Sequence, residues 1–172
     1  SVDEIAGFAS AMIDNAEKFE KSGFCIDTCG TGGDGKEMIN VSTISAIIAA
    51  SAGVKVAKHG NRSISSKCGS ADVLEALGIK IDLLPSQMQK QLIQTNFAFL
   101  FAPVYHKAMR YAMPVRRKLN IPTVFNILGP LSNPARVDGQ VIGVFRKDLV
   151  SPMINVLKKI GLKRAMVVHG FD

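Results

Sequence analysis

The chain has 172 residues, of which 47% are hydrophobic and 20% are charged, and its formal net charge is +7. This length is enough for one globular domain with a full core, or for parts of two, and the composition is that of an ordinary globular protein. No apolar run approaches the ~18 residues of a membrane-spanning helix, and the first residues do not resemble a signal peptide. The net charge is compatible with a nucleic acid as partner, with a polyanionic small substrate, or simply with a solvated surface.

The cysteine and aromatic content indicates the cellular compartment and narrows the choice of binding partner. The three cysteines, Cys25, Cys29 and Cys68, form no paired C-x-x-C motif, and no pair of histidines lies near them. They predict free thiols in a reducing compartment, and therefore a cytoplasmic protein. The chain has no Trp and only two Tyr, so stacking platforms for single-stranded nucleic acid are scarce and nucleic acid is not the favoured partner.

Strand and helix patterns alternate along most of the chain. Strands are predicted at 24–28, 54–57, 97–101, 140–145 and 164–168, with a short one at 79–83, and helices at 5–16, 42–52, 70–77, 85–94, 106–119 and 149–160. A turn broken by Pro and Gly is predicted at 126–134. The alternation predicts an α/β fold with a mainly parallel sheet flanked by helices.

The same patterns suggest two structural units. Residues 1–22 and 85–120 are expected to form a smaller all-helical subdomain, whereas 23–84 and 121–172 are expected to form the α/β domain. The chain starts without Met inside a helical pattern and stops directly after a strand. We therefore expect it to be a piece of a longer protein.

A glycine-rich segment follows the first predicted strand. Four glycines lie within residues 30–35, flanked by Asp27 and Asp34. Glycines lack a Cβ and permit positive φ angles, so successive N–H groups can converge on one anion. The segment predicts a phosphate site, and the acids suggest that the phosphate arrives with a metal or a sugar.

Two nucleotide-binding motifs almost fit this segment. Gly30, Gly32 and Gly35 match G-x-G-x-x-G, but the second strand is followed by the base Lys58 where a dinucleotide site needs an acid. The segment also matches G-x-x-x-x-G-K, but Glu37 stands where a P-loop needs a hydroxyl for magnesium. Each motif therefore lacks a residue that it needs to bind its nucleotide: the acid is replaced by Lys58 and the hydroxyl by Glu37.

A second polar cluster spans residues 58–72, after the next predicted strand. It combines basic, amide and hydroxyl side chains within a short distance. Ligands of open α/β sheets bind at the carboxyl ends of the strands, so this cluster and the glycine segment are expected to face one crevice. The alternative is a polar surface loop with helix caps, and Ser70 is predicted to be such a cap.

Five collinear motifs in these regions resemble the anthranilate phosphoribosyltransferase family. They lie at residues 30–34, 40–43, 58–62, 69–72 and 125–135. The similarity runs from about Asp3 to Asp172. The family is about twice this length, so the resemblance implies that about half of the protein is absent from the chain.

The resemblance implies a nucleoside phosphorylase/phosphoribosyltransferase-like fold and the transfer of a phosphoribosyl group from phosphoribosyl pyrophosphate to the amine of anthranilate. It also implies Mg²⁺ as cofactor, with Ser42 as one metal ligand, and a homodimer formed through the helical part. The implied residues for phosphoribosyl pyrophosphate are Gly30, Gly33, Asp34, Asn40, Val41, Ser42, Thr43, Lys58, His59, Gly60, Asn61, Arg62, Ser63, Ile64, Ser65, Ser66 and Ser70. The implied residues for anthranilate are Gly30, His59, Asn61 and Arg116.

The expected mechanism is electrostatic, with no acid or base assigned. Mg²⁺, backbone amides and Lys58 would stabilise the departing pyrophosphate, while the amine of anthranilate is placed beneath ribose C1. A guanidinium such as that of Arg116 can form two parallel hydrogen bonds to a carboxylate. Two alternatives stay open: a related transferase or nucleoside phosphorylase with another acceptor, and a basic nucleic-acid-binding relative without this activity.

The chain departs from the family pattern at two places. Met38 stands where relatives often carry a hydroxyl residue, so we expect one phosphate contact to be lost or to be made by the backbone instead. The family also has an Asp-Glu pair that ligates Mg²⁺ a few residues beyond the last strand, and the chain stops at Asp172. We therefore expect the isolated chain to bind the donor weakly and to be nearly inactive.

Overall fold

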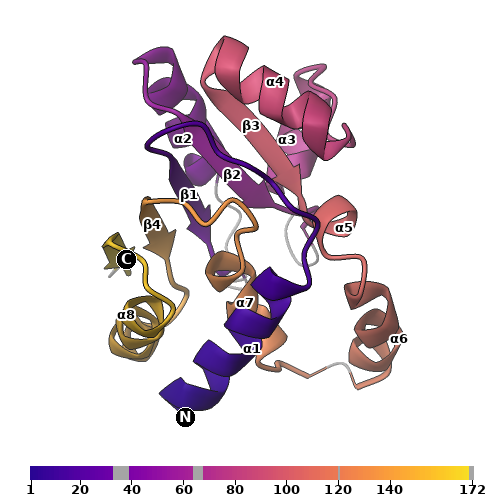
Figure 1. The fold of residues 1–172 in the computed structure, drawn as a ribbon. Helices are drawn as coiled ribbons and strands as arrows, with labels where there is room; N and C mark the ends of the chain where they lie inside the picture. Colours follow the sequence, from indigo (N-terminus) through magenta and orange to yellow (C-terminus); the bar gives the residue numbers. More distant parts are fainter. Residues whose placement is uncertain (33–38, 64–67, 120, 171–172) are drawn as a thin grey trace.

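Five parallel strands form one sheet in the computed structural model, which describes residues 1–32, 39–63, 68–119 and 121–170. The order across the sheet is β3-β2-β1-β4-β5 (Figure 1). The strands are β1 (Ile26–Gly30), β2 (Val56–Gly60), β3 (Phe97–Phe101), β4 (Gly139–Gly143) and β5 (Arg164–Val168). The parallel α/β fold predicted from the sequence is confirmed.

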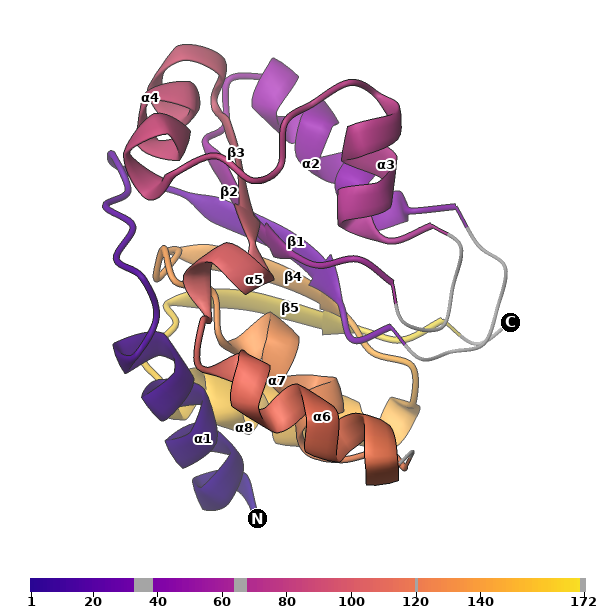
Figure 2. The same cartoon turned by 90° about the vertical axis from the view of Figure 1, so that its right-hand side faces the viewer.

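Helices cover both faces of the sheet. They are α1 (Val2–Asp14), α2 (Val41–Ser51), α3 (Ser70–Ala76), α4 (Pro85–Thr95), α5 (Ala102–Tyr105), α6 (Met109–Leu119), α7 (Phe125–Leu131) and α8 (Val150–Lys159), with a 3-10 turn at Lys147–Leu149. Figure 2 shows α2 and α3 on one side of the sheet, and α1, α7 and α8 on the other. No helix in the described part of the chain is both long and apolar enough to span a membrane.

Alternating strand residues contribute to hydrophobic clusters on both faces of the sheet. On one face, Val56, Phe97 and Phe99 pack with Ala46 of α2 and Leu74 of α3. On the other face, side chains of α4 pack against β2 and β3, and those of α7 and α8 pack against β4. Burial on both faces explains why β3 is an uninterrupted apolar run.

The helices assigned from sequence to one subdomain contact different parts of the molecule. Helix α4 packs against β3, whereas α1 packs against α7 and α8. Figure 1 shows α6 beyond α5, at the margin of the molecule. The division into a helical subdomain and an α/β domain stays a prediction.

Two predicted elements are wrong. Residues 79–83 form no strand; Ile81 is buried beside α3 and β3, so apolar packing rather than a strand ladder accounts for the alternation. The predicted turn at 126–134 contains helix α7, although Gly129 and Pro130 lie inside it. Pro130 is next to the end of that helix, and Leu128 and Leu131 are buried against α1, so tertiary packing outweighs local propensity.

The first two strands end later than the sequence pattern indicates. β1 ends at Gly30 and not at residue 28, and β2 ends at Gly60 and not at residue 57. Polar residues that we expected in connections therefore lie inside strands and are buried. This shift determines how the candidate site is built.

Candidate functional site

The candidate site lies where the carboxyl ends of β1 and β2 meet the starts of α2 and α3. Gly30 ends β1 and is exposed; a Cβ there would meet no protein atom closer than 3.6 Å. Gly32 has φ +64°, the left-handed conformation expected of the glycine segment. The backbone leaving β1 is therefore open to a ligand on its outer side.

Asn40 is the N-cap of α2 and links two parts of the site. Its Oδ1 accepts hydrogen bonds from the Thr43 amide (2.9 Å) and the Ser42 hydroxyl (3.1 Å). Its Nδ2 donates to the Cys68 carbonyl at 2.8 Å, immediately before α3. Because both ends of the amide are occupied, Asn40 fixes the start of α2 relative to the start of α3.

Lys58 is buried beneath the start of α2, with 1% of its surface exposed. Its ammonium donates to the Thr28 carbonyl at 2.5 Å and to the Ser42 hydroxyl at 3.1 Å. Burial lowers the pKa of Lys58, and the negative charge of Asp27 opposes that shift. The protonated Lys58 ammonium lies against Ser42, so it adds positive charge at the N-terminus of α2. A helix N-terminus itself favours anions.

A buried polar network on the other face of the sheet includes Asp27, which is 0% exposed. Its Oδ2 accepts from Asn133 Nδ2 (2.8 Å) and from Gln140 Nε2 (3.3 Å). Burial raises the pKa of Asp27, and the Lys58 charge opposes the shift. The network joins β1, β4 and the connection between α7 and β4, so it fixes the strands that carry the site.

His59 points away from Lys58, toward α7. Its Nδ1 donates to the Gly129 carbonyl at 3.1 Å, and its ring lies edge-on to His106 with centroids 5.0 Å apart. Burial, and then the neighbouring His106, lowers the pKa of His59 to about 3, so the ring is neutral. Its Nε2 is buried and has no hydrogen-bond partner among the described residues.

Arg116, the residue implied for anthranilate, is in α6 and half-buried. Its guanidinium lies 5.1 Å from the centroid of the Phe125 ring, at the start of α7. Since Gly129 of α7 also holds His59, this helix contacts two of the residues implied for the acceptor.

The structure brings several implied residues together and assigns some of them a different contact. Asn40, Ser42, Thr43 and Lys58 are joined by the bonds at the start of α2, and Arg62 and Ser63 bond to α3. The Thr43 side chain is fully buried, and its amide is occupied by Asn40. Implied residues outside the described part of the chain are Gly33, Asp34, Ile64, Ser65 and Ser66.

The predicted cap at Ser70 is wrong. Gly69 is the N-cap of α3, and Ser70 is the first helical residue. The carboxylate of Asp72, three residues further on, accepts from the Gly69 amide at 3.0 Å. Sequence reasoning gave no role to Asp72 or Glu75, although acids in the first turns of a helix are a recognisable N-terminal signal.

A protein-only metal site is absent from residues 1–32, 39–63, 68–119 and 121–170, where no group of three His, Cys, Asp or Glu could hold an ion. Ser42 nevertheless fits one metal contact. A hydroxyl has two lone pairs, and the bonds with Asn40 and Lys58 use its proton and one of them. One neutral oxygen ligand remains available there.

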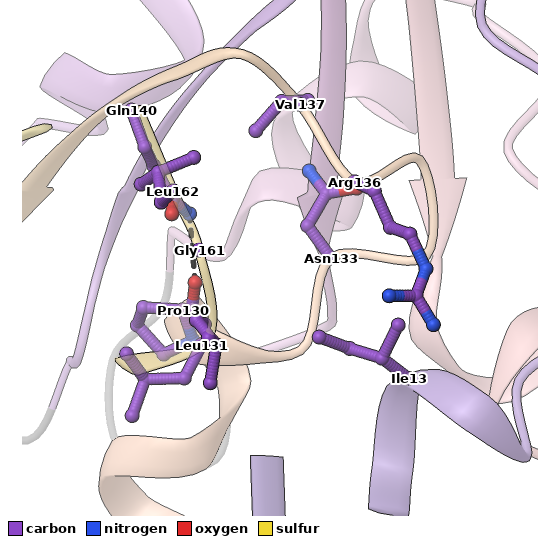
Figure 3. A pocket seen from close by; sticks show the side chains of 10 residues that line it. Ile13, Pro130, Leu131, Asn133, Arg136, Val137, Gln140, Gly161 and Leu162 are labelled. Atoms are coloured by element: carbon purple, nitrogen blue, oxygen red, sulfur yellow. Dashed lines mark hydrogen bonds between the residues drawn. The ribbon is translucent and has the colours of Figure 1, made fainter. Parts of the chain in front are cut away.

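A cavity of about 230 Å³ lies elsewhere in the molecule (Figure 3). Gln140, Gly161 and Leu162 line it at the amino-terminal ends of β4 and β5, and Figure 3 shows Gln140 bonded to the Pro130 carbonyl, at 2.7 Å. The cavity is therefore at the opposite end of the strands from Gly30. It is separate from the candidate site.

Comparison with known proteins identifies relatives of the chain. An anthranilate phosphoribosyltransferase of Caldanaerobacter subterraneus is 57% identical over the whole chain, and one of Persephonella marina is 55% identical. The chain spans about half the length of these curated relatives, since it covers 51% of each. The resemblance predicted from the five motifs is confirmed.

Solved structures of anthranilate phosphoribosyltransferases also resemble this chain. The anthranilate phosphoribosyltransferase of Thermus thermophilus superposes with a TM-score of 0.94 at 47% identity, over 99% of this chain and 52% of that chain. The Saccharomyces cerevisiae enzyme in complex with PRPP and Mg gives 0.92 at 32% identity, over 99% of this chain and 48% of that one. The family model "Glycosyl transferase family, a/b domain" matches residues 22–172. The chain belongs to this glycosyl transferase family.

Proposed function

We propose that the protein containing this chain transfers the phosphoribosyl group of phosphoribosyl pyrophosphate to the amine of anthranilate, and that the chain supplies the donor site. The observation that carries the proposal is the arrangement of Asn40, Ser42 and Lys58 at the start of α2, beside the open backbone of Gly30. This arrangement suits a pyrophosphate. The homodimer and the cytoplasmic location stay predictions.

The chain stabilises the departing pyrophosphate by charge and dipole. Lys58 is too deeply buried to lie at the surface, so its ammonium acts by raising the positive potential at the start of α2. The field is fixed before the substrate binds, because Thr28 and Ser42 hold the ammonium in place. A preorganised field of this kind favours negative charge that develops as the C1–oxygen bond lengthens.

Ser42 is the residue through which we expect the chain to contact Mg²⁺. Mg²⁺ in phosphate sites is held by phosphate oxygens, waters and a few protein oxygens, so one hydroxyl is a fitting contribution from this part of the protein. When bound, the ion neutralises charge on the pyrophosphate. A Saccharomyces cerevisiae relative is described in complex with PRPP and Mg, which supports Mg²⁺ as the cofactor.

The acceptor is expected on the α6–α7 side of the site. Arg116 would receive the anthranilate carboxylate, and Asn61 and His59 would lie beside the ring. The neutral imidazole of His59 adds no positive charge there. A Saccharomyces cerevisiae relative is described in complex with 4-fluoroanthranilate, which supports anthranilate as the acceptor class.

Replacing Arg116 with alanine in the full-length protein should raise the KM for anthranilate tenfold or more. The reason is the loss of charged hydrogen bonds, which contribute about 1.5–3 kcal/mol. The KM for phosphoribosyl pyrophosphate should change less than about twofold by the same reasoning. The measurement is the fall of anthranilate fluorescence with phosphoribosyl pyrophosphate and Mg²⁺.

Arg110→Ala is the matched control, because Arg110 lies in the same helix but bonds to the Tyr111 hydroxyl, at 2.7 Å. It should leave both KM values unchanged. An unchanged KM for anthranilate in the Arg116 variant would refute the acceptor assignment. Absence of turnover by the wild-type protein would refute the proposed function itself.

A further inference from the structure

Arg62, at the exit of β2, is bonded to two carboxylates of α3. Its Nη2 donates to Glu75 Oε1 at 2.7 Å, and its Nη1 bonds to Glu75 Oε2, so the contact is bidentate. Nη1 also lies 3.4 Å from Asp72 Oδ1. One cation and two anions leave this group with a net charge of −1. The guanidinium is therefore already neutralised before any phosphate arrives.

Asp72 also binds the backbone on both sides of the connection between β2 and α3. Its Oδ2 accepts from the Ser63 amide (3.2 Å) and from the Gly69 amide (3.0 Å). One carboxylate oxygen of Asp72 thus binds the backbone at both ends of the β2–α3 connection, at Ser63 and at Gly69. A Cβ on Gly69 would lie 2.3 Å from the Ser63 nitrogen and 2.5 Å from Asp72 Oδ2, so this approach requires glycine.

The helix that carries these acids is fixed to the rest of the site. Ala71 and Leu74 are fully buried in the core under α3, and the Ala71 amide donates to the Asn61 carbonyl at 3.3 Å. Asn40 holds the Cys68 carbonyl from the start of α2. Helix α3, which carries the two acids, is therefore bonded both to the segment after β2 and to the start of α2.

We propose that Asp72 and Glu75 are positioning residues, which hold Arg62 and the ends of the β2–α3 connection in the geometry that binds the pyrophosphate of the donor. Arg62 is then a structural partner of α3 and not a phosphate ligand. This inference rests on the proposed function for the identity of the donor. It assigns a role to two acids that would otherwise count only as surface charges of α3.

The test compares Glu75→Gln and Asp72→Asn with the wild type in the full-length protein. If the acids position Arg62, each variant should weaken binding of Mg²⁺-pyrophosphate and raise the KM for phosphoribosyl pyrophosphate about tenfold, equivalent to about 1.4 kcal/mol. The kcat should change less than about twofold, because the change affects binding geometry and not the reacting atoms. If Arg62 were instead a phosphate ligand restrained by Glu75, Glu75→Gln would release it and lower the KM.

Glu17→Gln is the matched control, since Glu17 is also paired with a cation and its side chain is 44% exposed, compared with 40% for Glu75. It should leave both constants unchanged. A lower or unchanged KM in the Glu75 variant overturns the proposal, as does a loss of kcat without a change in KM.

Calorimetry of Mg²⁺-pyrophosphate binding separates this proposal from the proposed function. Wild-type protein that binds pyrophosphate but does not consume anthranilate would refute anthranilate as the acceptor. The positioning role of Asp72 and Glu75 would then be tested by the pyrophosphate affinities of their variants. Wild-type protein that binds no pyrophosphate would overturn the positioning role as well.

Discussion

Replacing Asp27 with alanine should lower the free energy of unfolding by about 2–5 kcal/mol, because the buried amides of Asn133 and Gln140 then lose an acceptor and a nearby negative charge is removed from Lys58. Asp27 is fully buried, and it is the carboxylate that opposes the burial-induced pKa shift of Lys58. Without it, Asn133 and Gln140 lose a buried acceptor, and the Lys58 ammonium, which Asp27 does not contact directly, loses the negative charge that favours it. Urea denaturation of the full-length protein measures the change.

A double variant and a control test the cause of this effect. Adding Lys58→Met to Asp27→Ala should recover part of the lost stability, because the uncompensated charge is then gone. Asp14→Ala is the control; Asp14 also pairs with a cation, Arg136, but its side chain is 63% exposed. It should cost less than about 1 kcal/mol. Equal losses in the Asp14 and Asp27 variants would contradict the role assigned to burial.

Lowering the pH from 7 to 5 should cost the protein about 2 kcal/mol of stability through His59 alone. Burial holds the pKa of His59 at about 3 in the folded state, against 6.5 for an ordinary histidine. Between these values the unfolded chain binds the proton and the folded chain does not. The stability that depends on neutral His59 is therefore complete above pH 6.5 and is lost as the pH falls toward 3, by up to about 1.4 kcal/mol per unit.

The measurement is urea denaturation at pH 7, 6 and 5 for the wild type and for His59→Gln. The variant should show a shallower pH dependence, whatever its absolute stability. Some dependence should remain, because burial also lowers the pKa of His106. Equal slopes in the two proteins would show that His59 is not held neutral by burial.

The sequence by itself determined the fold class and indicated the end of the sheet where the candidate site lies. Phe97–Phe101 and Arg164–Val168 are strands as predicted, and α2 and α4 differ from their predicted ranges by a residue or so, because apolar periodicity is a local property. The described parts of the glycine segment and of the 58–72 cluster lie at the ends of the neighbouring strands β1 and β2, as expected for a parallel sheet. The five motifs also indicated the relatives that the comparisons found.

The tertiary structure alone decided which polar groups are partners. Lys58 was expected just after a strand, but it lies inside β2, paired with Phe99 of β3. Its ammonium bonds to Thr28 and Ser42, 30 and 16 residues away. The Pro/Gly segment at 126–134 contains a helix because its leucines pack against α1. Asp72 and Glu75 reach Arg62 only after α3 folds back beside β2. Such contacts depend on the free energy of desolvation and on distances through space, and spacing along the chain records neither.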